Sequence, residues 1–200
     1  MRSDALVAVT EDSLLGGCVR LLQPVDGYRA AVDPVLLAAS APVQEGDRVL
    51  DLGCGAGAVA LCLLARVPDL LVTGIEQAPE MRDLAERNAA LNNAGDCFIP
   101  CLGRIETRPL AFKQGAFDLV VSNPPYLESK RANLPENILK AAAHAEGEVP
   151  LIEWVEAAHL ALCHKGRFCM IHRADRLADI LAAMKNRFGG IEVHPLFPKP

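Results

Sequence analysis

The 200-residue sequence predicts a doubly wound α/β fold preceded by a small β-hairpin. From residue 48 onward, short apolar segments rich in Val, Leu and Ile alternate with longer segments of helical periodicity. Buried strands that alternate with helices are typical of a parallel sheet with right-handed crossovers. A glycine-rich turn follows the first of these strands, and two consecutive prolines follow the fourth. Open α/β sheets bind ligands at the carboxyl ends of their strands, so both turns are candidate sites.

The first 42 residues predict a small N-terminal part, separate from a main domain at residues 43–200. Residues 6–22 alternate loosely between apolar and polar positions around Gly16-Gly17, which indicates a β-hairpin with a glycine turn. The segment VDPVLLAAS predicts a short helix that Asp33 caps and in which Pro34 occupies the first turn.

The main domain follows with strands and helices in alternation. Helix 58–67 is apolar on nearly every side, which indicates a buried helix, and helix 79–93 is amphipathic and opens with Pro79 and Glu80. Gly166 separates a later helix from the strand after it. The expected strands are 48–52, 70–76, 96–102, 117–123, 167–173 and 191–197, and the expected helices are 58–67, 79–93, 150–163 and 174–188.

The composition indicates an ordinary globular protein, with 51% hydrophobic and 22% charged residues. No apolar stretch approaches the roughly 18 residues that a membrane span needs, and the first residues show no charged region followed by a long apolar run. We therefore expect a soluble, cytoplasmic protein without a membrane partner. The net charge of −5 argues mildly against broad nucleic-acid binding, and we interpret the local basic clusters as solvated faces.

The seven cysteines predict reduced thiols, because their number is odd and none of them forms a Cys-x-x-Cys pair. Cys97 and Cys101 lack a second pair and nearby histidines. The five histidines do not cluster at ligand spacing either, so we expect no metal site.

The stretch DLGCGAG, residues 51–57, joins the first predicted strand of the main domain to a buried helix. Its glycines let the backbone turn tightly and approach a ligand, and the helix that follows offers free N–H groups. Glu76 ends the next strand, where a carboxylate can bind a ribose diol. The same pattern fits a dinucleotide, so a nicotinamide dehydrogenase is an alternative. Asp51 disfavours it, because a carboxylate suits an ammonium group better than a pyrophosphate.

S-adenosylmethionine carries such an ammonium group and no phosphate. DLGCGAG together with Glu76 resembles the class I S-adenosylmethionine-dependent methyltransferases, whose sheet is Rossmann-like. This fold often has a third acidic residue that meets the adenine, and here Arg104 stands in its place, with Glu106 as a substitute. The resemblance implies cofactor contacts from Asp51, Gly53, Cys54, Gly55, Gly57 and Glu76.

The methyltransferase fold usually adds a seventh, antiparallel strand, and this sequence has no segment left to supply it. Either the sequence is truncated, or the sheet edge is completed in another way, for example by a partner chain. We expect a monomer or a weak homodimer.

The stretch VVSNPPYLES, residues 120–129, ends an apolar strand with Asn123 and a stiff pair of prolines. Methylation of an amino group on a nucleobase does not require a charged residue as general base. Two acceptors on its N–H bonds can aim the nitrogen lone pair at the methyl group, and the Asn123 side chain and the Pro124 carbonyl can be these acceptors. Tyr126 offers a face on which a flipped-out base can stack.

SNPPYL resembles the (Asn/Asp/Ser)-Pro-Pro-(Tyr/Phe/Trp) motif of amino-group N-methyltransferases. The resemblance implies that Asn123, Pro124, Pro125 and Tyr126 form the catalytic set. This NPPY motif is shared by adenine-N6, guanine-N2 and protein glutamine-N5 methyltransferases.

Residues 23–40 and 143–162 resemble the bacterial tRNA adenine-N6 methyltransferases that modify valine tRNA next to its anticodon. In that family the N-terminal segment folds over the cofactor. Tyr28 and Asp33 would then line the pocket, although a packed tyrosine and a helix cap are equally simple interpretations. We expect Lys130 and Arg131, in the polar connection 128–149, to lie where a substrate backbone passes, and this connection to be mobile until substrate binds.

The favoured function is S-adenosylmethionine-dependent methylation of adenine N6 in an RNA substrate, a tRNA. The alternatives are protein glutamine-N5 or rRNA guanine-N2 methylation, and a cofactor-binding subunit that does not catalyse.

Overall fold

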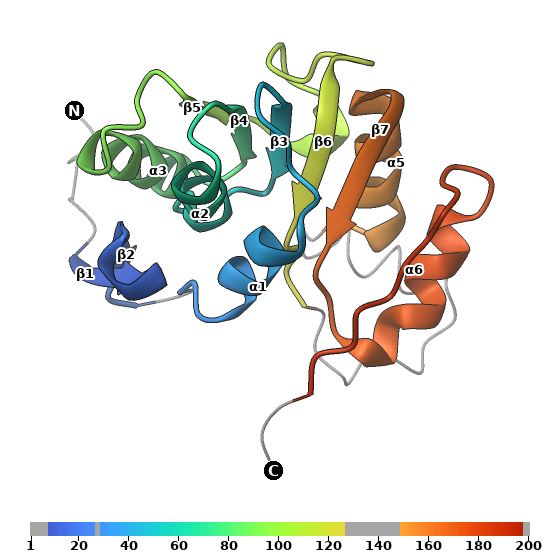
Figure 1. Cartoon of the computed structure of the whole chain (residues 1–200), viewed down its shortest axis with the longest axis horizontal. Coiled ribbons are helices and arrows are strands. Elements are labelled where there is room, and N and C mark those ends of the chain that lie inside the picture. Colours follow the sequence, from blue (N-terminus) through green and yellow to red (C-terminus); the bar gives the residue numbers. More distant parts are fainter. Residues whose placement is uncertain (1–7, 27–28, 127–148, 198–200) are drawn as a thin grey trace.

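The computed structural model describes residues 8–26, 29–126 and 149–197. Its main domain contains a parallel sheet in the order β5-β4-β3-β6-β7, with β3 at the centre (Figure 1). The strands are β3 (Arg48–Leu52), β4 (Leu71–Glu76), β5 (Phe98–Leu102), β6 (Phe117–Ser122) and β7 (Leu162–Met170). The expected α/β architecture with a Rossmann-like sheet is confirmed.

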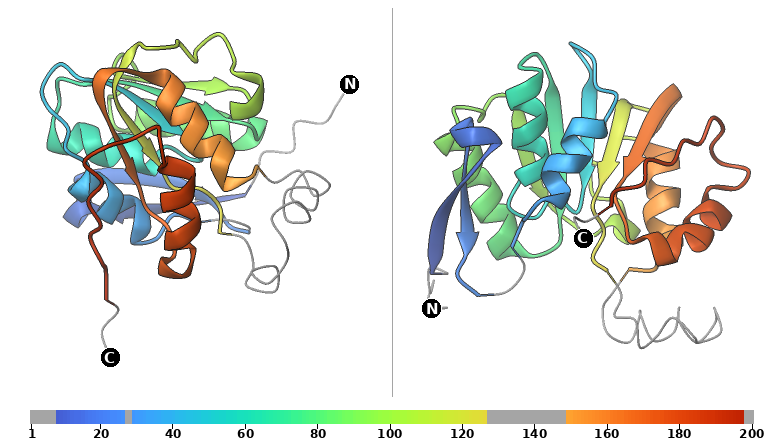
Figure 2. Two further views of the ribbon diagram at one scale, coloured as in Figure 1. Left: turned by 90° about the vertical axis from the view of Figure 1, so that its right-hand side faces the viewer. Right: turned by 60° about the horizontal axis from the view of Figure 1, so that its bottom comes forward.

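Helices cover both faces of this sheet, as a doubly wound fold requires. The helices are α1 (Asp33–Ser40), α2 (Ala58–Arg66), α3 (Pro79–Leu91), α5 (Leu151–Ala161) and α6 (Leu177–Met184). A hydrophobic core lies on each face of the sheet, and alternate residues of β3 point into one or the other. Val49 of β3 packs in the cluster of α1, α2 and α3, whereas Leu50 and Leu52 pack in the cluster of α5. The different views of the ribbon show α1, α2 and α3 together and α5 beyond β7 (Figure 2).

The N-terminal hairpin is also confirmed. β1 (Val9–Leu14) pairs antiparallel with β2 (Val19–Pro24), and a 3-10 turn at Leu15–Gly17 joins them. Val19 and Leu21 of β2 are buried in the same cluster as α2 and α3, so the hairpin is attached to the helices of the main domain. Figure 1 shows it beside α3, apart from the sheet. The domain boundary at residue 42 stays a prediction.

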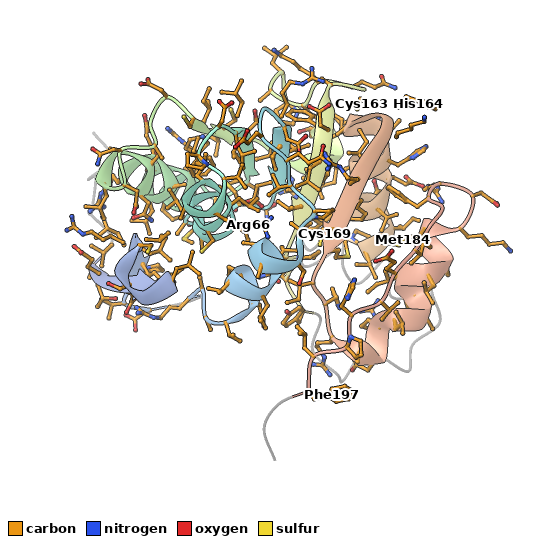
Figure 3. All side chains as sticks on the ribbon, in the orientation of Figure 1. Arg66, Cys163, His164, Cys169, Met184 and Phe197 are labelled. Carbon is orange, nitrogen blue, oxygen red and sulfur yellow. The ribbon has the colours of Figure 1, made fainter. Side chains whose placement is uncertain are left out.

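Two arginines attach the C-terminal end of α1 to the main domain. Arg66, which ends α2, donates to the Ala39 carbonyl at 2.7 Å and is labelled beside α1 in Figure 3. Arg167 of β7 donates to the Pro42 carbonyl and also forms an ion pair with the buried carboxylate of Asp47 at 2.7 Å. α1 is therefore held between α2 and β7, on the side of the sheet where the glycine turn lies.

The prediction of a strand at residues 191–197 is wrong. This segment forms no strand, and its side chains are exposed, up to 85% for Phe197, which Figure 3 labels at the C-terminal tail. An apolar segment forms an edge strand only where it also packs against the sheet, and this one gains no such burial. Within the described residues, neither a sixth nor a seventh strand joins the sheet.

Two boundaries in the C-terminal half also differ from the prediction. β7 begins at Leu162 rather than Arg167, and it runs through Gly166 with a register shift against β6. Four residues of β7, Gly166 among them, lie between the positions that pair with Phe117 and Leu119, so this glycine lies within the strand. The expected helix 174–188 is a 3-10 turn (Ala174–Arg176) followed by α6, which ends at Met184.

In the part of the chain that the structure describes, no helix is both long and apolar enough to cross a membrane. Each of the seven cysteines is a free thiol. Among the described residues, no three His, Cys, Asp or Glu side chains gather in a group that could hold a metal ion.

Candidate functional site

A pocket opens where the carboxyl ends of β3 and β6 lie side by side. The chain leaves β3 toward β4 and β5 on one side and returns to β6 on the other, so this is the topological switch point of the sheet. The pocket is open to solvent, and the space in it, with the solvent at its mouth included, is about 390 Å³. Its lining consists of Gln23, Ala30, Pro34, Gly53, Cys54, Gly55, Ala56, Ala58, Val59, Met81 and Asn123.

The structure thus brings together three segments that the sequence analysis singled out separately. The glycine turn forms one wall, Asn123 of the proline loop forms another, and residues of the N-terminal part form a third. The Ser122 hydroxyl at the end of β6 donates to the Leu52 carbonyl at the end of β3, at 3.1 Å. This buried bond fixes the start of the proline loop next to the start of the glycine turn.

The three positions of the turn are glycine for different structural reasons. Gly53 and Gly57 have φ angles of +70° and +87°, and a Cβ at either would lie 2.6 Å from Trp154 or 2.5 Å from Phe98. These two glycines are required by packing behind the turn. A Cβ at Gly55 would meet only the Met81 side chain, at 3.8 Å, and Met81 also lines the pocket. Gly55 is therefore the glycine that leaves room beside the pocket.

Gly57→Ala should destabilise the protein by about 2–4 kcal/mol, since the left-handed conformation costs about 1–2 kcal/mol and the contact with Phe98 adds an overpacking cost. Urea unfolding measures it. Gly95→Ala is the matched control, because a Cβ at Gly95 meets nothing within 4 Å and its φ is not in the left-handed region. Equal unfolding free energies for the two variants would contradict this account of the turn.

Glu76 holds the glycine turn from behind. Its Oε2 accepts a hydrogen bond from the Gly55 N–H at 2.9 Å, and its Oε1 accepts one from the Ala78 N–H at 2.8 Å. A carboxylate has about four acceptor sites, so each oxygen keeps acceptor capacity for a ligand hydroxyl. Glu76 does not line the pocket itself.

Asp51, the charged residue of the turn, is buried at 1% exposure and is not among the residues that line the pocket. One carboxylate oxygen accepts the Ala60 N–H in the first turn of α2. Within the described residues, its Oδ2 has no hydrogen-bond partner. The pKa of Asp51 is raised from 3.8 to about 7, chiefly by burial; the Ala60 bond lowers it, and the nearby charge of Glu76 raises it.

Asp33 does not cap α1, contrary to one of the two interpretations. The N-cap position is Val32 without a side-chain bond, and Asp33 already lies inside the helix. Its carboxylate accepts a hydrogen bond from the Tyr126 hydroxyl at 2.9 Å instead. Asp33 is also absent from the pocket lining, where the neighbouring Pro34 takes part. The structure therefore places Asp33 against the proline loop and outside the pocket lining.

The Tyr126 side chain is held from two directions. Its hydroxyl donates to Asp33 and lies 3.5 Å from Asn123 Oδ1, and its ring meets the ring of His172 edge to face at 5.1 Å. Burial, together with Arg176, lowers the pKa of His172. No local pattern in the sequence links His172 to Tyr126, which lies 46 positions earlier. Pro124 is buried and Pro125 is exposed, so the proline loop runs from the core to the surface.

Gln23 is a pocket residue that sequence reasoning missed. Its buried side chain forms two hydrogen bonds with the backbone of Ala30, at 2.6 and 3.4 Å, and a third with Asp12 at 2.9 Å. These bonds hold the segment before α1 against β2. A single polar residue on a short strand does not reveal which face of the strand it takes, so only the tertiary structure identifies it.

The remaining candidates divide as follows. Cys54 lines the pocket, and burial raises its pKa well above the ordinary value, so its thiol stays protonated. Arg104 donates to Glu106 Oε1 at 3.0 Å, and Glu106 Oε2 has no hydrogen-bond partner among the described residues. Tyr28 and the connection 127–148, with Lys130 and Arg131, lie outside the described residues.

Residues 32–194 match the model of the methyltransferase small domain. The chain is 35% identical over 158 residues to a tRNA1(Val) (adenine(37)-N6)-methyltransferase from Porphyromonas gingivalis, a match that covers 76% of this chain and 61% of the relative. A shorter match of 46% identity over 83 residues is to the release factor glutamine methyltransferase of Deinococcus radiodurans, covering 42% of this chain and 28% of that protein.

Among solved structures, a predicted O-methyltransferase from Agrobacterium tumefaciens superimposes with a TM-score of 0.61 at 26% identity, covering 79% of this chain and 69% of that chain. The chain spans about three fifths of the length of the first of these curated relatives.

Proposed function

We propose that this chain, which belongs to the methyltransferase small domain family, transfers a methyl group from S-adenosylmethionine to an exocyclic amino group, adenine N6 of a tRNA. One observation supports this proposal above the others. The glycine turn and Asn123 line the same pocket, at the switch point of the sheet. A cofactor on the turn and an amino group on the proline loop would therefore be neighbours.

The residues around the turn fit this cofactor. The orphaned oxygen of Asp51 suits a donor such as the ammonium group, and an ionised carboxylate there would gain the partner that it lacks. Gly55 leaves room on the pocket side, and Glu76 keeps acceptor capacity for a ribose diol. Glu106 Oε2 is an acceptor suited to the adenine amino group. When bound, S-adenosylmethionine supplies an electrophilic methyl group on sulfur.

The proline loop would hold the acceptor. The Asn123 side-chain oxygen and the Pro124 carbonyl accept the two N–H bonds of the amino group, so the nitrogen lone pair turns toward the methyl group. The prolines keep both acceptors still. Tyr126, held by Asp33 and His172, presents a fixed ring on which the base stacks. The new C–N bond would form as the methyl–sulfur bond breaks, which leaves S-adenosylhomocysteine, and the cationic nitrogen would then lose one proton to solvent.

The substrate assignment draws on the relatives. The tRNA adenine-N6 methyltransferase match covers 76% of this chain, whereas the glutamine methyltransferase match covers 42%. Adenine N6 of a tRNA is thus the favoured acceptor, and glutamine N5 of a release factor is the second candidate. The proposed location is the cytoplasm, because the relatives are named as tRNA methyltransferases. A monomer or a weak homodimer stays a prediction, which a solution mass measurement tests.

The test is an assay of the whole chain with S-adenosylmethionine labelled with tritium on its methyl group. One reaction receives total tRNA and another receives a release factor. After digestion of the RNA to nucleosides, the label should elute as N6-methyladenosine. Label on glutamine would favour the second candidate. A chain that binds the cofactor product, S-adenosylhomocysteine, but labels neither substrate would contradict the proposal and favour a subunit that does not catalyse.

A further inference from the structure

Asn88 makes an unusual set of contacts for a helix residue. It lies on α3, its exposure is 0%, and its side-chain amide forms three hydrogen bonds to the backbone of two other segments. Its Oδ1 accepts the Leu22 N–H at 2.7 Å, and its Nδ2 donates to the Leu22 carbonyl at 2.9 Å. The same Nδ2 donates to the Ala56 carbonyl in the glycine turn at 2.9 Å. A fully bonded buried amide fixes the relative position of the groups that it joins.

One helical turn later, Asn92 makes the same pair of hydrogen bonds to a residue of β2. Its Oδ1 accepts the Arg20 N–H at 2.9 Å, and its Nδ2 donates to the Arg20 carbonyl at 2.7 Å. Four residues of a helix rise about 6 Å, and two residues of a strand rise about 6.7 Å, so the two side chains match alternate residues of β2. Each amide exchanges two bonds with one strand residue, as a neighbouring strand would. α3 thus serves as the partner for the outer edge of β2.

Of these two asparagines, only Asn88 also contacts a residue that lines the pocket. Ala56, to which it donates, lines the pocket directly. Its other partner, Leu22, precedes Gln23, which also lines the pocket and holds Ala30 there. One side chain therefore sets the distance between two walls of the pocket, one from the hairpin and one from the glycine turn.

On this geometry, and resting on the proposed function, we propose that Asn88 is a positioning residue through which docking of the N-terminal hairpin and binding of S-adenosylmethionine stabilise each other. A cofactor that requires both walls in place favours the docked hairpin. By linkage, a docked hairpin raises the affinity for the cofactor by the same factor. Asn92 holds the hairpin without touching the turn and does not take part in this coupling.

The test compares Asn88→Ala with Asn92→Ala by calorimetry with S-adenosylhomocysteine, at a temperature where circular dichroism shows both variants folded. Both variants lose two hydrogen bonds to β2. Asn88→Ala should weaken binding at least tenfold, whereas Asn92→Ala should stay within about twofold of wild type. Equal affinities in the two variants would overturn the coupling, because loosening of the hairpin alone would then explain both.

A second measurement uses the wild-type protein and does not depend on the folding of a variant. S-adenosylhomocysteine should slow hydrogen exchange at the Leu22 amide, which Asn88 holds, together with the amides of the glycine turn. Slowing confined to the glycine turn would overturn the inference and leave the proposed function intact. Failure of the wild-type protein to bind S-adenosylhomocysteine would overturn both.

Discussion

Asn123→Ala should lower the rate of methyl transfer at least a hundredfold and leave the affinity for S-adenosylhomocysteine within about threefold of wild type. The side-chain oxygen acts on the amino group in the transition state, and loss of one preorganised polar contact of this kind costs about 10²–10³ in rate. The cofactor is proposed to lie on the glycine turn, and Asn123 forms only a separate part of the pocket wall. Single-turnover transfer and calorimetry measure the two quantities separately.

Asn123→Asp is the matched control for this variant. It keeps an oxygen at the same position with nearly the same volume, so it should retain more activity than Asn123→Ala at a pH where its carboxylate can accept a hydrogen bond. Transfer by Asn123→Ala at the wild-type rate would remove Asn123 from the mechanism. A parallel loss of transfer and of cofactor affinity would instead assign Asn123 to the shape of the pocket.

Asp51→Asn should make the ligand-free protein more stable near pH 8 and weaken cofactor binding. Because burial raises the pKa of Asp51 from 3.8 to about 7, the folded protein binds this proton more tightly than the unfolded chain does. The stability from this effect is fully present below about pH 4 and is lost as the pH rises through 7. Asparagine stays neutral, keeps an oxygen for the Ala60 N–H and removes this loss, a gain of about 2–4 kcal/mol at pH 8.

Bound cofactor should favour the ionised form of Asp51, whereas the ligand-free protein favours the neutral form. An ammonium group next to Asp51 favours the carboxylate, so binding of S-adenosylhomocysteine to the wild-type protein should strengthen as the pH rises from 5.5 to 7.5 and release a proton. Asp51→Asn should lose this dependence and bind at least tenfold more weakly at pH 7.5, since a hydrogen bond to a charged group contributes about 1.5–3 kcal/mol.

Calorimetry in buffers of different ionisation enthalpy measures the proton release, and urea unfolding across the same pH range measures stability. If binding had the same pH dependence in the wild-type protein and in Asp51→Asn, the proposed contact between Asp51 and the ammonium group would be contradicted. A wild-type stability that does not fall between pH 4 and 8 relative to Asp51→Asn would contradict the raised pKa. If Asp51→Asn is more stable but binds S-adenosylhomocysteine more weakly, Asp51 lowers the stability of the ligand-free protein and strengthens cofactor binding.

The two motifs could be recognised from sequence because the residues of each lie next to one another in the chain. DLGCGAG needs its glycines within a single turn, and SNPPYL needs its prolines next to Asn123. Residues that act through distant partners left no such pattern. Asp33 has the features of a helix cap, and its actual partner, Tyr126, lies 93 residues away. Asn88 has the pattern of an ordinary amphipathic helix residue, although it joins two walls of the pocket.

By itself, the sequence determined the alternation of strands and helices, the hairpin and the positions of both turns. Periodicity and turn chemistry depend on residues a few positions apart, and they act before any long-range contact forms. Only the tertiary structure decided that Gly53 and Gly57 make room for Trp154 and Phe98, and that residues 191–197 stay outside the sheet. These features depend on which distant side chains meet, and burial and steric contact between them arise only once the elements are packed.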